Sequence, residues 1–264
     1  MTRRGRWLIA AMLGGLGWLA AACSVAPSPR PLLVAAAVSL ADPLQEVAGA
    51  EPPSPRAGPS VQFHFASSGA LQQQILQGAP VDVFLSAGKR QLDALESAGR
   101  LLPGSRRELF SNELVLVVPS RSSRRTLSFE GLAQPELRSI AIGDPSVPAG
   151  DYARQVLASM GLSAVVAPKL VPLGSVRAVA QAVAEGHVDA GFVYRTDAQA
   201  VEGLRITAVA LAGSHDPIRY AGAVLKTSRD PAAAEAYLRS LAESAARKPF
   251  RRHGFRVPGP SSQP

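Results

Sequence analysis

The stretch FHFASSGALQQQI, residues 63–75, changes its hydrophobic pattern in the middle. The first residues alternate apolar and polar side chains, as a half-buried strand does, whereas the last residues have a helical pattern. Ser67, Ser68 and Gly69 stand between the two patterns. In α/β proteins the loop after a strand is a common place for ligands, because the next helix begins there. The stretch therefore predicts an α/β unit with a candidate binding loop at Ser68.

The same succession of strand and helix continues along the chain. Apolar runs bounded by turn residues predict strands at 32–37, 61–66, 81–85, 114–118, 139–142, 169–171, 189–194 and 206–210. Helical patterns lie between them at 40–48, 70–76, 90–98, 152–160, 176–184 and 231–246. This alternation favours an α/β architecture, with mainly parallel sheets covered by helices.

Two segments carry a strand-like run that no helix precedes. They are ELFSNELVLVVPS at 108–120 and HDPIRYAGAVL at 215–225. We interpret them as two crossings between lobes, an arrangement that permits hinge closure. The Pro-rich segment 48–60 lies between a helix and a strand of one unit and is predicted to be only a loop.

Composition and charge exclude several classes of protein. The chain has 264 residues, of which 47% are hydrophobic and 18% charged, as in globular domains. Its net charge is +8, and basic residues crowd the C-terminal segment at Arg247, Lys248, Arg251, Arg252 and Arg256. No aromatic residues interleave with them as a nucleic-acid surface would require, so we interpret this segment as a solvated face and expect no nucleic acid as partner.

The first 22 residues have the pattern of a secretory signal peptide. Arg3, Arg4 and Arg6 precede an uncharged apolar run from Trp7 to Ala22, which is shorter than the ~20 residues of a spanning helix. Cys23 follows directly after small residues, and the segment resembles a bacterial lipoprotein signal, in which this cysteine becomes the lipidated first residue. The alternative is a conventional cleavage site with Cys23 as an incidental residue.

Export predicts a protein of the periplasm or cell surface, anchored to the membrane through lipid on Cys23. Residues 23–30 are rich in proline and serine and are predicted to form a tether. A lone cysteine forms no internal disulfide, so no disulfide cross-link stabilises the fold.

Four loops after predicted strands combine hydroxyls, glycine and small residues: AAAVSLAD, ASSGAL, GDPSVPAGDYA and PLGSVRAV. Ser39, Ser68 and Ser175 can cap the helices that follow, and Pro148 suits an early helical position. Tyr194 ends another strand with a phenol at the same rim. Any one such serine is explained by capping alone. Several helix starts that converge, however, indicate an anion site.

From Leu33 to Phe255 the chain resembles the molybdate-binding solute-binding proteins of bacterial ABC importers. The resemblance is carried by AAAVSL, FASSGALQQQILQGAPVDVFLSAG, NELVLVVP, IAIGDPSVPAGDYARQVL, GSVRAVAQAVAEGHVDAGFVYRTDA and RRHGF. It implies the two-lobe periplasmic-binding-protein fold of type II, called a Venus flytrap, in which each lobe is a mixed sheet flanked by helices. Lobe one would comprise residues 31–112 and 221–264, and lobe two residues 113–220.

The resemblance also implies five oxyanion ligands. The family's serines fall on Ser39 and Ser68, its main-chain amides on Ala149 and Val176, and its phenol on Tyr194. It further implies a monomer that binds molybdate or tungstate and delivers it to an ABC permease with its ATPase. The oxyanion would be the cargo, so neither a cofactor nor a direct metal ligand is expected.

The chemistry of these five residues agrees with a fully ionised tetrahedral anion. None is charged and none is a carboxylate, so a ligand hydroxyl such as that of monoprotonated phosphate would find no acceptor. Sulfate or another oxyanion stays open as an alternative ligand, and an anion-sensing ectodomain stays open as a different class. We expect no enzyme, since a nucleophile needs an adjacent base and the inferred cleft pairs none with Ser39 or Ser68.

Several charged residues lie next to these loops. Arg177 follows Val176 and invites a role as counter-ion, but we favour an orientation away from the anion or a bridge between lobes. Asp144 and Asp151 are expected to shape the VPAG loop. The histidines have no metal-ligand spacing; they are His64, His187, His215 and His253.

Overall fold

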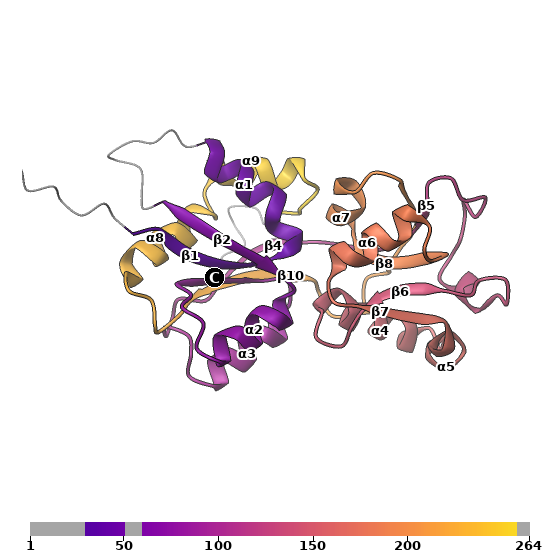
Figure 1. Ribbon diagram of the computed structural model, residues 1–264, viewed down its shortest axis with the longest axis horizontal. Helices are drawn as coiled ribbons and strands as arrows, with labels where there is room; N and C mark the ends of the chain where they lie inside the picture. Colours follow the sequence, from indigo (N-terminus) through magenta and orange to yellow (C-terminus); the bar gives the residue numbers. More distant parts are fainter. Residues whose placement is uncertain (1–29, 51–59, 258–264) are drawn as a thin grey trace, which may run out of the picture.

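A computed structural model describes residues 30–50 and 60–257 of the protein. Two lobes lie side by side, each a sheet with helices on its faces (Figure 1). The predicted signal peptide, Cys23 and all but the last residue of the predicted tether lie outside the described residues. Within the described ranges, no helix has the length and apolar character needed to cross a membrane.

The described strands of the first lobe form a five-stranded sheet in the order β2-β1-β3-β10-β4. β1 (Leu32–Ala37) pairs in parallel with β2 (Val61–Ala66) and β3 (Val83–Ser86). β10 (Arg219–Val224) runs antiparallel to β3 and to β4 (Arg107–Ser111). The covering helices are α1 (Ala41–Ala50), α2 (Ser68–Leu76), α3 (Lys89–Ser97), α8 (Pro231–Ser240) and α9 (Ser244–Arg252), and a 3₁₀ turn at Val38–Leu40 precedes α1.

The described strands of the second lobe form another five-stranded sheet, ordered β7-β6-β8-β5-β9. β6 (Ile140–Gly143) is parallel to β7 (Leu170–Leu173) and β8 (Ala190–Tyr194). β5 (Leu114–Pro119) is antiparallel to β8 and to β9 (Leu204–Val209). β5, β6 and β8 are buried along their whole length, which explains their unbroken apolar runs. The helices are α4 (Pro148–Ser159), α5 (Ser163–Val166), α6 (Val176–Glu185) and α7 (Arg195–Ala200), with 3₁₀ turns at Glu130–Ala133 and Ala167–Lys169.

The chain passes between the sheets twice, after β4 and again before β10. These passages fall in the two segments that the sequence marked as crossings, whereas the lobe boundaries themselves stay predictions. The expected predominance of parallel pairing is wrong. The strands that cross from the other lobe, β5 and β10, have no helical crossover and pair antiparallel with both neighbours, so each sheet is mixed.

The single helix predicted at 231–246 is also wrong, because the chain forms α8 and α9 there. Ala242 N–H donates to Arg239 O and Glu243 N–H to Ser240 O, and these tight turns end α8. The new direction of α9 allows Phe250 to stack on Phe110 of β4, with ring centroids 3.8 Å apart. The break is therefore set by packing in the first lobe.

Candidate functional site

All five residues proposed as oxyanion ligands line one small cavity between the lobes. Ser39 and Ser68 come from the first lobe, and Ala149, Val176 and Tyr194 from the second. The cavity is small, at about 10 Å³, which is close to the room that a single water molecule needs. The residues follow the carboxyl ends of β1, β2, β6, β7 and β8, which is where parallel strands place their loops together.

Ser68 turns its hydroxyl oxygen toward the main chain of the neighbouring loop. Ala87 N–H donates to Ser68 Oγ at 3.0 Å. Because the bond uses Ser68 as acceptor, and no other partner of this hydroxyl occurs among the described residues, its hydrogen is left to donate. The sequence suggested that Ser68 caps α2, and this prediction is wrong. The backbone of Ser68 is already helical, and Ser67 is the cap, with its Oγ 3.4 Å from Ala70 N.

Ser39 does not cap a helix either. It lies in the 3₁₀ turn after β1, and its Oγ is 2.9 Å from the hydroxyl of Tyr220 in β10. The cap predicted at Ser175 is confirmed, since Ala178 N–H donates to its Oγ at 3.1 Å. Pro148 occupies the start of α4, also as predicted.

Tyr194 is the last residue of β8 and is buried. Its hydroxyl has no hydrogen-bond partner within the described part of the chain. Burial raises the pKa of Tyr194 well above its usual range, so the phenol keeps its proton. A buried polar group without a partner costs free energy, and a ligand oxygen in the cavity would relieve that cost.

The N-terminal ends of three helices also line the cavity. Ser68 begins α2, Ala149 is the second residue of α4, and Val176 begins α6. The first amides of a helix have no partner inside it, and each helix end favours a nearby anion by ~0.3–1 kcal/mol. The cavity therefore presents amides and hydroxyl hydrogens, and its described lining contains no charged side chain.

Sequence comparison assigns the chain to a known protein family. The sequence model described as "Bacterial extracellular solute-binding protein" matches residues 32–256. The chain belongs to this family.

Among the relatives of this solute-binding protein is YvgL of Bacillus subtilis, named as a substrate-binding lipoprotein of an ABC transporter. It is 39% identical over 197 residues, covering 74% of this chain and 75% of YvgL. The molybdate-binding protein ModA of Escherichia coli is 32% identical, covering 86% and 89%. The structure of the Azotobacter vinelandii periplasmic molybdate-binding protein superposes with a TM-score of 0.73 at 27% identity, covering 86% of this chain and all of that one.

Arg177 of this solute-binding protein is not a counter-ion in the cavity. Its Nη2 donates to Asp42 Oδ2 at 2.9 Å, and its Nε lies 3.4 Å from Asp197 Oδ1. Asp42 belongs to α1 of the first lobe and Arg177 to α6 of the second. The interpretation of Arg177 as a bridge between lobes is confirmed.

Asp197 was missed by the sequence reasoning. Its side chain is 0% exposed, and neither carboxyl oxygen makes a hydrogen bond within the described residues. Burial raises the pKa of Asp197 to about 7, against the opposing effect of Arg177. No sequence signal marks this aspartate, because its burial depends on α6, β5, β8 and β9 packing against α7.

Of the two aspartates around the VPAG loop, Asp144 acts on local geometry, as expected, whereas Asp151 contacts the other lobe. Asp144 Oδ1 accepts from the amide and the hydroxyl of Ser146, at 2.8 and 2.6 Å. Asp151 pairs with Arg90 of α3 at 3.2 Å, which is a second ion pair between the lobes.

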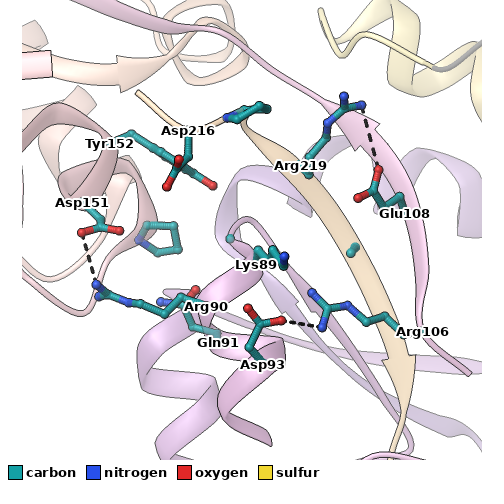
Figure 2. A pocket seen from close by; sticks show the side chains of 14 residues that line it. Lys89, Arg90, Gln91, Asp93, Arg106, Glu108, Asp151, Tyr152, Asp216 and Arg219 are labelled. Carbon is teal, nitrogen blue, oxygen red and sulfur yellow. Dashed lines mark hydrogen bonds and ion pairs between the residues drawn. The ribbon is translucent and has the colours of Figure 1, made fainter. Parts of the chain in front are cut away.

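Figure 2 shows a larger pocket, of about 510 Å³. Pro148 lines both this pocket and the cavity. The charged side chains of the larger pocket pair mostly with each other: Arg90 with Asp151, Arg106 with Asp93 and Arg219 with Glu108. This mixture of carboxylates and cations suits a solvated entrance better than a site for a dianion. In the described part of the solute-binding protein, no group of three His, Cys, Asp or Glu side chains could hold a metal ion.

Proposed function

We propose that the chain is an extracytoplasmic molybdate- or tungstate-binding protein that delivers its ligand to an ABC permease and its ATPase. The oxyanion would be held by Ser39, Ser68, Ala149, Val176 and Tyr194. This assignment is supported by the character of the cavity between the lobes, which offers hydrogen-bond donors and no carboxylate. The molybdate-binding relatives agree with it.

The donor set favours a ligand that carries no hydrogen. Ser68 already accepts from Ala87 N–H, and the buried Tyr194 phenol keeps its proton. A protonated oxyanion would find no carboxylate in the lining to accept its hydrogen, and a buried hydroxyl without an acceptor costs ~1–3 kcal/mol. Molybdate and tungstate carry no proton at neutral pH, whereas phosphate largely does. As a solute-binding protein in this role, the chain is a transport component and not an enzyme.

Binding would bring the lobes together, because the proposed ligands come from both. We propose lobe boundaries at 112/113 and 220/221, the second of which falls two residues inside β10, an exported protein attached through lipid on Cys23, and a monomeric receptor. The apolar run before Cys23 supports export, and the lipoprotein name of the Bacillus subtilis relative supports the anchor.

Sulfate is the second candidate ligand, because it also lacks a hydrogen at neutral pH and presents four oxygens to the same donors. Thermal unfolding of the mature chain, produced without lipid, tests both ligands against phosphate. At ~100 times the dissociation constant a ligand adds ~2.7 kcal/mol, which raises Tm by about 5–10 °C in a chain of this size. We expect this rise with molybdate and tungstate only. An equal rise with sulfate would favour the second candidate, and no rise with any oxyanion would contradict the proposal.

A further inference from the structure

A chain of hydrogen bonds lies behind Ser39 and reaches both crossings between the lobes. Tyr220, in β10, contacts Ser39 Oγ at 2.9 Å. Asn112, between β4 and β5, donates from Nδ2 to the Tyr220 hydroxyl at 3.3 Å and to Thr196 Oγ1 at 2.9 Å. Tyr220 is fully buried, and Asn112 is almost so. The network thus connects a cavity residue of the first lobe to the start of α7 in the second.

Elementary chemistry sets the direction of the bonds that Asn112 makes, and the direction between Tyr220 and Ser39 follows from the partners that remain. The backbone N–H of Glu113 can only donate, and it lies 2.9 Å from Asn112 Oδ1. The amide of Asn112 must therefore present Oδ1 to Glu113 and its two Nδ2 hydrogens to Thr196 and Tyr220. Tyr220 then accepts from Asn112, and its own hydrogen has Ser39 Oγ as its partner within the described structure.

Burial raises the pKa of Tyr220 well above its usual range, so this phenol retains the proton that it donates. With Ser39 Oγ engaged as an acceptor, the serine hydrogen has no described protein partner. Ser39 lines the cavity, so the remaining place for this hydrogen is toward a ligand. A serine hydroxyl has one hydrogen and two acceptor sites; Tyr220 occupies one of these sites, and the hydrogen is left to donate to a ligand.

We propose that Tyr220, held by Asn112, is a positioning residue that fixes Ser39 as a hydrogen-bond donor and thereby selects oxyanions without a hydrogen. The inference rests on the proposed function, since it concerns the affinity of that site. It extends the site beyond the five residues proposed as ligands. It also assigns the hinge residue Asn112 a part in ligand selection.

Tyr220 also packs as a core residue, and the two roles must be separated. Its ring contacts the Phe255 ring at 5.1 Å and the Tyr194 ring at 5.8 Å between centroids. Tyr220→Phe keeps these ring contacts and removes only the hydroxyl. If the hydroxyl acts through Ser39, its removal has little effect when Ser39→Ala is already present.

The test is a double-mutant cycle with calorimetric titration of molybdate into wild type, Tyr220→Phe, Ser39→Ala and the double variant. We expect Tyr220→Phe to weaken binding about tenfold in the wild-type background and less than about twofold in the Ser39→Ala background. We also expect the ratio of molybdate to phosphate affinity to fall in Tyr220→Phe, because the acceptor site of Ser39 Oγ that Tyr220 occupied becomes available to a ligand hydroxyl. A purely structural role of Tyr220 would not move that ratio selectively.

Tyr237→Phe in α8 is the matched control, since it removes a phenol hydroxyl from a helix that contributes nothing to the cavity, and we expect no change in affinity. Asn112→Ala is a second variant in case Tyr220→Phe fails to fold. The loss of molybdate affinity that it causes should also vanish when Ser39→Ala is present. An unchanged affinity in Tyr220→Phe, or an equal loss in both backgrounds, would overturn the inference while leaving the proposed function intact. A wild type that binds no molybdate would overturn both.

Discussion

The guanidinium of Arg177 donates to the carboxylate of Asp42 across the cleft, at 2.9 Å. Arg177 belongs to the helix whose first residue, Val176, lines the cavity, and Asp42 belongs to the helix that follows Ser39. Their side chains are 22% and 38% exposed, so the pair is only partly shielded from solvent. The two helices that flank the proposed oxyanion site are therefore tied together when the lobes meet.

Asp42→Asn should weaken molybdate binding about two- to fivefold, because an ion pair at this exposure contributes ~0.5–1 kcal/mol and exists only with the lobes in contact. The loss should shrink at 0.5 M salt, which screens the wild-type pair. Titrations at low and high salt measure both effects. Asp93→Asn is the matched control, since its partner Arg106 lies in the same lobe. Equal losses in the two variants would contradict a role in closure.

Asp197 should make stability depend on pH. Its pKa is about 7 in the folded protein against an ordinary value near 3.8, so between these values the folded state holds a proton that the unfolded state has lost. The contribution of Asp197 to the free energy of unfolding must then fall as pH rises from about 4 to about 7. Asp197→Asn should remove this contribution, leaving the interlobe pair of Arg177 with Asp42 in place.

Denaturant unfolding of wild type and Asp197→Asn between pH 4 and 8 measures this difference. We expect the variant to gain stability relative to wild type as pH rises through this window. Parallel curves for the two proteins would show that the buried carboxyl does not titrate there.

Gly69 allows the lobes to touch. A Cβ atom at this position would lie 2.3 Å from the carbonyl oxygen of Ser146 in the other lobe. Gly69→Ala should therefore weaken molybdate binding at least tenfold by blocking closure. Alanine favours a helix over glycine by up to ~1 kcal/mol, so Tm without ligand should not fall. Titration and thermal unfolding together separate these effects.

Gly49→Ala provides the comparison for that variant. Gly49 also lies in a helix of the first lobe, and a Cβ there would meet nothing within 4 Å. Its affinity for molybdate should match that of wild type. Unchanged affinity in Gly69→Ala as well would mean that the contact with Ser146 is not needed for binding.

Much of the fold could be predicted because local patterns and packing agree. β1 and β2 have the predicted bounds, since alternating or continuous apolar runs end at clear turn residues. The break between α8 and α9 could not be predicted in this way. It depends on Phe250 reaching Phe110, which lies 140 positions earlier in the chain and on another element.

The loops around the cavity were predictable for a similar reason, because each follows a strand, whereas Ala149 and Val176 were expected only from the family resemblance. The hydrogen-bond network behind Ser39 could not be predicted. Asn112 and Tyr220 are 108 positions apart, and each looks like an ordinary strand or linker residue in the sequence. The sequence does not distinguish Ser67 from Ser68 as the cap of α2. The choice depends on the backbone angles of the two residues, which only the structure shows.

The central claim is that neutral donors in the cavity between the lobes bind molybdate. Calorimetric titration of wild type beside Ser68→Ala and Tyr194→Phe tests it most directly. We predict one molybdate per wild-type chain and an affinity about tenfold lower or worse in each variant, because each loses a hydrogen bond to a charged ligand, worth ~1.5–3 kcal/mol. Unchanged affinity in both variants would contradict the account and place the ligand elsewhere.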